Sequence, residues 1–170
     1  MQLTKLRLTP VLALAVLAGC ASGSLQRQGE TADGQTNASA REAIMAACKA
    51  ANDDPILAPL EGKLLPIGSR GPEKFEMLSN LAYATEEERP AIKVYAERLM
   101  GCQAQIFEHA RQHLTPMHVA LLQGSFGADN ALLAQLHNSQ MTYSEVNQAR
   151  ARLRNENDAA IVRLNARRGR

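Results

Sequence analysis

The chain has 170 residues, no tryptophan, three phenylalanines and three tyrosines, and its formal charge is +2 at pH 7. Two of its basic residues, Lys5 and Arg7, lie within residues 1–19, which contain no acid, so the rest of the chain is about neutral. This balance argues against a general nucleic-acid partner. The scarcity of aromatic residues predicts a core of small aliphatic contacts, as in helix bundles.

The N-terminal segment has the composition of an export signal. Lys5 and Arg7 are followed by an apolar stretch from Val11 to Leu17 and then by small residues that precede a cysteine. The stretch is shorter than the about 20 residues that a membrane-spanning helix needs. It is therefore typical of a cleaved secretory signal.

The end of this segment, Leu17-Ala18-Gly19-Cys20, resembles the lipobox of bacterial lipoproteins. The resemblance implies that residues 1–19 are a cleaved lipoprotein signal peptide and that Cys20 is lipidated on its thiol and on its new amine. It also implies a lipid-anchored protein of the outer membrane whose domain faces the periplasm, because Ala21 is not the aspartate that retains lipoproteins in the inner membrane. The alternative is an ordinary cleaved signal with a chance cysteine.

Residues 20–38 are predicted to be the lipidated cysteine and a disordered tether. Residues 21–38 are rich in glycine, serine, glutamine and threonine, and Leu25 is their one large apolar side chain. Such a segment cannot bury enough surface to offset the entropy lost on ordering.

Capping patterns mark three predicted helix starts. In each, a serine or threonine precedes a glutamate by three residues, so that the two residues can exchange hydrogen bonds at a helix N-terminus. The first pattern predicts a helix from residue 39 to about residue 51, which buries Ile44, Cys48 and Ala51. The three pairs are Ser39 with Glu42, Thr85 with Glu88, and Thr142 with Glu145.

The segment Ile56–Ile67 is apolar but is interrupted by prolines. Pro55, Pro59 and Pro66 exclude both a long helix and an interior strand. The segment either lies over the bundle and closes its core, which we favour, or keeps its apolar side chains open for a partner. A short helix near residues 73–80 is predicted to follow.

The longest apolar stripe predicts a helix from Thr85 to about Leu114. Pro90 must then lie in its first turn, where amide hydrogens have no helical partner. The stripe has the three- and four-residue steps of one helix face. Its members are Ile92, Tyr95, Leu99, Cys102, Ile106 and Ala110.

Two more helices complete the chain. Thr115 and Pro116 predict an N-cap and a first-turn proline for a helix that extends to about His137. Gly124 and Gly127 weaken its middle and predict a kink or a close helix contact there. The last helix begins at the third capping pattern and presents an apolar stripe of Val146, Leu153, Ala160 and Leu164.

No run of 4–8 alternating residues predicts a strand. The elements together predict an all-α fold, an antiparallel bundle of four to five helices after a flexible N-terminal tether. Residues 39–170 are predicted to form this helical domain, because about 130 residues are enough for one domain.

Cys48 and Cys102 both lie on apolar stripes that are predicted to be buried. The periplasm favours oxidation, so we expect one disulfide that joins the first helix to the long one. The alternative is two buried free thiols. A redox enzyme is not expected, since neither cysteine belongs to a Cys-x-x-Cys pair.

His109 and His113 lie four residues apart on one helix, next to Glu108 and before His118. This spacing places two imidazoles on one face, as metal ligands require. The order is not the His-Glu-x-x-His of metalloproteases, and no further ligands cluster nearby. We therefore interpret them as exposed helix histidines and predict no metal, no cofactor and no catalytic residue.

The end of the last helix is basic. Its arginines could contact anionic lipid head groups, lipopolysaccharide phosphates or an acidic partner. The favoured alternative is a solvated helix face with cations well placed at a helix C-terminus. The candidate residues for an anionic contact are Arg163, Arg167, Arg168 and Arg170.

These features favour a non-enzymatic binding or adaptor module that acts on another envelope component, either a protein or the cell wall. Anchoring would act by raising the local concentration of the domain near its target. Three alternatives remain: a pilotin-like secretion accessory, which the chain resembles only in build; an inhibitor or immunity lipoprotein; and a cell-wall-active or metal-dependent enzyme.

Overall fold

The computed structural model describes residues 32–69 and 71–168. The predicted signal peptide, Cys20 and residues 21–31 of the predicted tether lie outside the described residues. The described part is helical, and its one β-bridge pairs Tyr83 with Thr142. The helices are α1 (Ala32–Ala50), η1 (Ala51–Asp53), η2 (Pro55–Leu60), α2 (Phe75–Leu78), α3 (Arg89–His113), α4 (Pro116–His137) and α5 (Tyr143–Arg168).

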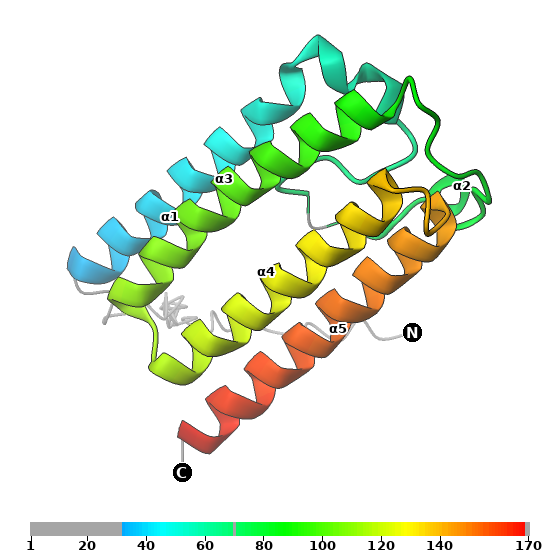
Figure 1. Cartoon of the computed structure of the whole chain (residues 1–170). Coiled ribbons are helices and arrows are strands. Elements are labelled where there is room, and N and C mark those ends of the chain that lie inside the picture. Colours follow the sequence, from blue (N-terminus) through cyan, green and yellow to red (C-terminus); the bar gives the residue numbers. More distant parts are fainter. Residues whose placement is uncertain (1–31, 70, 169–170) are drawn as a thin grey trace, which may run out of the picture. The chain divides into compact units, whose positions relative to one another are not determined.

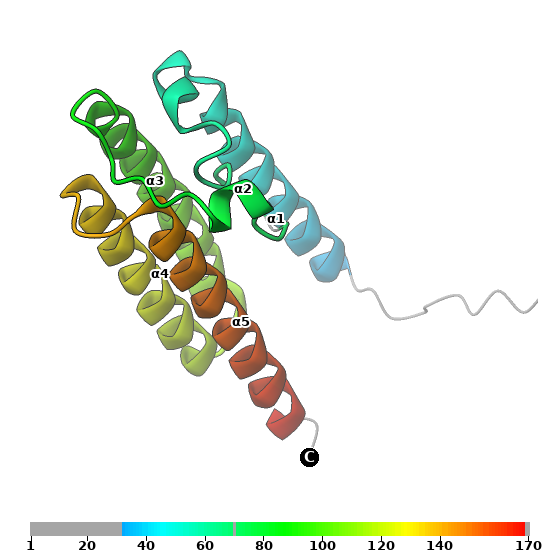
Figure 2. The same cartoon turned by 90° about the vertical axis from the view of Figure 1, so that its right-hand side faces the viewer.

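The four long helices alternate in direction, and each packs against the next one along the chain: α1 on α3, α3 on α4, and α4 on α5 (Figure 1). The predicted all-α antiparallel bundle is thus confirmed. The short α2 packs against α5 and lies between α5 and α1 (Figure 2). Among the described residues, no helix is both long enough and apolar enough to span a membrane.

Two of the three predicted capping boxes form. The backbone amide of Glu88 donates to the Thr85 hydroxyl at 3.3 Å, and the Thr85 amide donates to the Glu88 carboxylate at 3.0 Å. Thr142 and Glu145 exchange the same pair of bonds at the start of α5. The first α-helical residue of α3 is Arg89, which directly follows Glu88 of the capping box, and Pro90 lies in the first turn as predicted.

The predicted helix start at Ser39 is wrong. Helix α1 begins at Ala32, so Ser39 lies inside it and residues 32–38 are helical rather than part of a tether. The physical reason is that a helix, once nucleated, extends at low cost through residues that contain no proline. The end of α1 is as predicted, since α1 stops at Ala50 and the Asp54 carboxylate caps η2 by accepting from the Ile56 amide at 3.0 Å.

A disulfide joins α1 to α3. Cys48 and Cys102 are bonded, with their Cα atoms 5.4 Å apart, and both residues are buried. The predicted disulfide is therefore confirmed. Closing a loop across a sequence separation of 54 residues stabilises the fold by about 4 kcal/mol in the chain-entropy model.

The proline-broken segment Ile56–Ile67 closes the core, as favoured above, and leaves only Ile56 strongly exposed among its large apolar residues. The Tyr95 hydroxyl of α3 donates to the Leu65 carbonyl at 2.7 Å. Such bonds satisfy backbone groups that the prolines prevent from pairing in a regular helix or sheet. The buried side chains of the segment are Leu57, Leu60, Leu64, Leu65 and Ile67.

The first turns of α5 hold this segment in place. The fully buried Asn147 amide donates to the Lys63 carbonyl at 2.8 Å and to the Met77 carbonyl at 3.1 Å. Arg154, further along α5, forms an ion pair with Glu73. The space between α1 and α5 is therefore filled at the end of the bundle where α5 begins.

The core lies at that same end. Its members come from the C-terminal end of α1, the segment after it, the first half of α3, the last turns of α4 and the first turns of α5. At the opposite end, only Ala110 is buried among the described residues of the four long helices. The bundle is thus closed at one end and open at the other.

The sequence predicted that Gly124 and Gly127 would mark a kink or a close helix contact, and neither glycine is in close contact with another described helix. A Cβ atom built at either position meets nothing within 4 Å, and α4 is continuous through both. We expect Gly124→Ala and Gly127→Ala each to raise the free energy of unfolding by about 1 kcal/mol, because alanine has the higher helix propensity.

Gly68 provides the matched control. Its φ is +74°, and an added Cβ would lie 3.2 Å from the Cys48 Cβ. Gly68→Ala is therefore expected to lower the stability. Urea denaturation followed by circular dichroism measures all three variants, and a loss of stability on Gly124→Ala would show that α4 has an unseen close neighbour.

Candidate functional site

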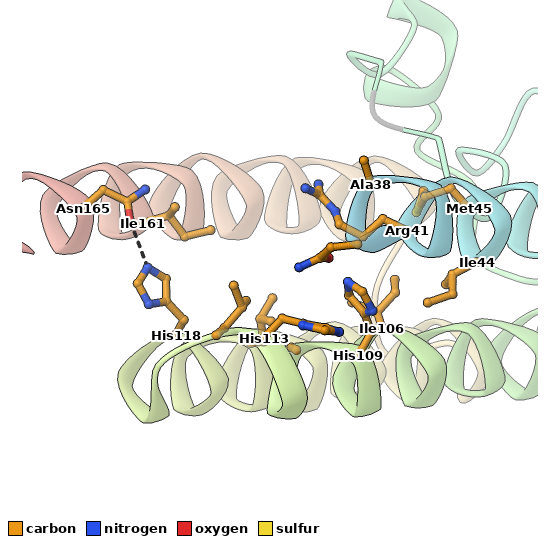
Figure 3. Close-up of a pocket in the computed structure, with 14 residues that line it drawn as sticks. Ala38, Arg41, Ile44, Met45, Ile106, His109, His113, His118, Ile161 and Asn165 are labelled. Atoms are coloured by element: carbon orange, nitrogen blue, oxygen red, sulfur yellow. Dashed lines mark hydrogen bonds between the residues drawn. The ribbon is translucent and has the colours of Figure 1, made fainter. Parts of the chain in front are cut away.

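A groove lies at the open end of the bundle, between α1, α3, α4 and α5, with a volume of about 510 Å³ (Figure 3). We call it the open-end groove. Its size is within the range of small-molecule sites, about 300–1,000 Å³. Its apolar lining consists of Ile44, Met45, Ile106, Leu114, Leu122 and Ile161.

The groove exists because the apolar stripes of the helices continue beyond the part of the bundle that is filled. Ile106 belongs to the predicted stripe of α3, and Ile44 to that of α1, yet both are only partly buried. The segment that covers the core at the closed end does not extend to these residues. Their side chains pack against the core on one side and line the groove on the other.

His109 and His113 of α3 both line the groove, with their ring centroids 4.5 Å apart. The Nε2 atom of His109 is buried and has no hydrogen-bond partner among the described residues. Partial burial, together with the nearby His113 and Arg41, lowers the pKa of His109 below its ordinary value of 6.5. An unmade hydrogen bond at a buried ring nitrogen is costly, so a small shift of the ring that exposed it to a ligand acceptor would be favourable.

His118 closes the other end of the groove. Its Nδ1 lies 2.7 Å from the Thr115 hydroxyl, and its Nε2 lies 3.1 Å from the Asn165 side-chain oxygen, which links α4 to α5 (Figure 3). Thr115 occupies the predicted N-cap position of α4, but its hydroxyl does not bond to the helix backbone. The Thr115 hydroxyl is hydrogen-bonded to the His118 imidazole instead.

The polar lining has one sign of charge. Arg41 of α1 extends over the groove on the side opposite to His109 (Figure 3). Arg41 makes no ion pair with a described residue. No carboxylate belongs to the described lining, and the adjacent Glu108 pairs with Arg111 on the outer face of α3.

Two histidines alone do not make a metal centre. Within residues 32–69 and 71–168, no three His, Cys, Asp or Glu side chains come together as metal ligands. His109 is partly buried rather than exposed as predicted, because α1 packs over this face of α3. The arrangement is chemically able to donate hydrogen bonds to an anionic or strongly polar group beside an apolar surface.

The predicted anionic-contact residues lie at the end of α5. Arg163 and Arg167 are exposed and make no ion pair with a described residue. Arg170 and the side chain of Arg168 lie outside the described residues, as does Cys20. The structure does not bring Arg163 or Arg167 into the groove lining.

Sequence reasoning missed a buried ion pair between α5 and α4. Arg150 donates from Nε to an Asp129 carboxylate oxygen at 2.6 Å and from a terminal nitrogen to the other at 3.2 Å. Its guanidinium also donates to the Tyr95 hydroxyl at 3.1 Å. One signal was present, because Arg150 lies on the apolar stripe between Val146 and Leu153, where a charge needs a partner.

Comparison with known proteins found no matching family model, no matching curated protein and no matching solved structure. The groove must therefore be interpreted from its own residues.

The lowered pKa of His109 leads to a prediction. His113→Gln and Arg41→Gln should each raise the pKa of His109 towards 6.5, because each removes a nearby positive charge. NMR titration of the His109 ring proton measures this change. His137→Gln is the control and should leave the pKa of His109 unchanged, because His137 lies at the closed end of the bundle.

The sign of the linked stability effect also follows. Since the folded state lowers the pKa of His109, the stability linked to its neutral form is present above about pH 6.5 and is lost as the pH falls through the folded-state pKa. A pKa of His109 that neither His113→Gln nor Arg41→Gln moves would mean that burial alone lowers it.

Proposed function

We propose that this chain is a bacterial outer-membrane lipoprotein, anchored through lipid on Cys20, whose helical domain is a non-enzymatic binding module for another envelope component. The observation that carries the binding part of the proposal is the open-end groove. It is preformed and mainly apolar, and it has a few polar groups that converge on it, which are the features of binding sites.

The anchor part of the proposal is supported by the sequence. The segment Leu17-Ala18-Gly19-Cys20 is similar to a lipobox, and it follows a basic and then an apolar stretch. If Cys20 is the first mature residue, residues 20–31 separate the lipid from α1. As a random coil, a segment of this length has an end-to-end distance of roughly 20 Å.

Tethering of this length would act by confinement. It would hold the groove close to the membrane surface and raise its effective concentration towards envelope ligands without any added contact. An enzyme has less support, because the described lining pairs its histidines with no serine, threonine or cysteine nucleophile and with no carboxylate that could orient them.

The anchor is tested with Cys20→Ser. We expect this variant to incorporate no radiolabelled palmitate and to lose firm sedimentation with envelopes, because several acyl chains on one residue hold a protein firmly to a bilayer, whereas a single chain binds it only marginally. Ala21→Ser, which keeps the cysteine, should behave like the unmodified protein. Continued firm sedimentation of Cys20→Ser would contradict the anchor.

The binding surface is tested with two neighbouring residues of α5. Ile161 lines the groove, whereas the next residue, Val162, is 67% exposed and does not. Ile161→Trp should fill the groove and abolish photo-crosslinking from a probe at position 113 to an envelope component, while Val162→Trp should leave it intact. Equal crosslinking in both variants would exclude the groove as the binding surface.

A further inference from the structure

The open-end groove combines two features that together select one class of ligand. Its walls are aliphatic, with Ile106, Leu122 and Ile161 contributed by three different helices. Its polar groups are one arginine, three histidines and two neutral asparagines, and no acid among the described lining residues balances the positive charge. A ligand that fits both features has an aliphatic part and a negative charge.

We infer that the groove binds one molecule of a single-chain acidic amphiphile, in which a carboxylate, phosphate or sulfonate head is attached to an aliphatic tail. This inference rests on the proposed function and names the ligand of its site. The head would lie between Arg41 and the exposed edges of His109 and His113, where a guanidinium and imidazole donors converge. The tail would pack on the aliphatic walls.

The hydrogen-bonding state of the groove supports this placement. The buried Nε2 of His109 has no described partner, and Arg41 makes no ion pair with a described residue. A guanidinium recognises planar and tetrahedral anions through paired donors. An anionic head would therefore give the exposed Arg41 a charged partner and would lie beside the His109 ring.

The alternatives fit less well. Residues 20–31 of the chain are mostly polar and would not fill an aliphatic groove. A second copy would place one basic groove against another, which repels. A flat membrane surface does not enter a groove between helices, so a monomeric amphiphile is the occupant that matches both its shape and its charge.

The charged groups that face the head are Arg41 from α1, His109 and His113 from α3, and His118 from α4, while α5 contributes the uncharged Ile161 and Asn165. A bound anion places a negative charge near His109 and should raise its lowered pKa, so by linkage the affinity for an anion that stays ionised should rise as the pH falls towards that pKa.

The test uses residues 20–170 with Cys20→Ser and the disulfide formed. This chain contains the whole core, which lies between Cys48 and Val146, and it needs no detergent. Isothermal titration with decanesulfonate, below its micelle-forming concentration, is expected to show one site. Octanesulfonate should bind about fifteenfold more weakly, because it has two methylenes fewer and each buried methylene contributes about fourfold.

Head-group selectivity and matched variants complete the experiment. Decyltrimethylammonium and decyl glucoside should bind at least about tenfold more weakly than decanesulfonate, and Arg41→Gln should cost a similar factor, as expected for a charged hydrogen bond. Arg152→Gln, which removes an exposed cation outside the groove, should have no effect. Ile161→Trp should abolish binding and Val162→Trp should not.

Several results would overturn the inference. Equal binding of the cationic and anionic decyl compounds, or no effect of Arg41→Gln in a variant that melts like the parent, would exclude recognition of an acidic head. Sedimentation with phosphatidylglycerol vesicles, but no binding of the sulfonate, would assign the surface to bilayers. A dimer that Ile161→Trp dissociates would assign the groove to a second copy.

Failure of this inference is distinguishable from failure of the proposed function. If decanesulfonate does not bind but Ile161→Trp still abolishes crosslinking in the envelope, the groove is a binding surface for another partner. If decanesulfonate binds but Cys20→Ser still sediments firmly with envelopes, the ligand class stands and the anchor does not.

Discussion

The structure depends on how the space between α1 and α5 is filled. The proline-broken segment that follows α1 packs into that space at one end of the bundle, where it buries Leu57, Leu60 and Ile67. Prolines prevent it from forming a helix of its own, so its backbone polar groups bond to side chains of the long helices, as in the Tyr95 bond to Leu65. Because the segment is short, it fills one end only. The groove at the other end is a direct consequence.

Polar contacts at the closed end hold this arrangement in a single register. Asn147 bonds to the carbonyls of Lys63, in the covering segment, and of Met77, in α2. The buried Arg150 pairs with Asp129 and with the Tyr95 hydroxyl, and so joins α5 to α4 and α3. Removing one partner of such a buried pair typically costs about 3–5 kcal/mol. Together with the disulfide between α1 and α3, these contacts make the closed end a rigid support for the open one.

That division of the bundle is suited to binding. A rigid end bears the stability, and the open end exposes aliphatic walls with Arg41 and three histidines above them. Apolar surface left open in this way is a cost to the isolated protein, which a ligand with an aliphatic part would offset. Because the charges of the groove share one sign, the same geometry that makes the groove also discriminates between ligands.

The sequence by itself determined the helices and their order, since local rules govern them: periodic apolar stripes, capping boxes at Thr85 and Thr142, and prolines in first turns. It also indicated the disulfide, because Cys48 and Cys102 lie on stripes that must face one core. Local rules were wrong at Ser39, where helix extension outweighed a capping pattern. Only the tertiary structure decided which part of each apolar stripe is buried. This depends on how much of the bundle the segment Ile56–Ile67 covers. Side chains from different helices form the groove, give it only positive charge and make the Arg150–Asp129 pair. The spacing of residues along the sequence does not show which helices bring these side chains together.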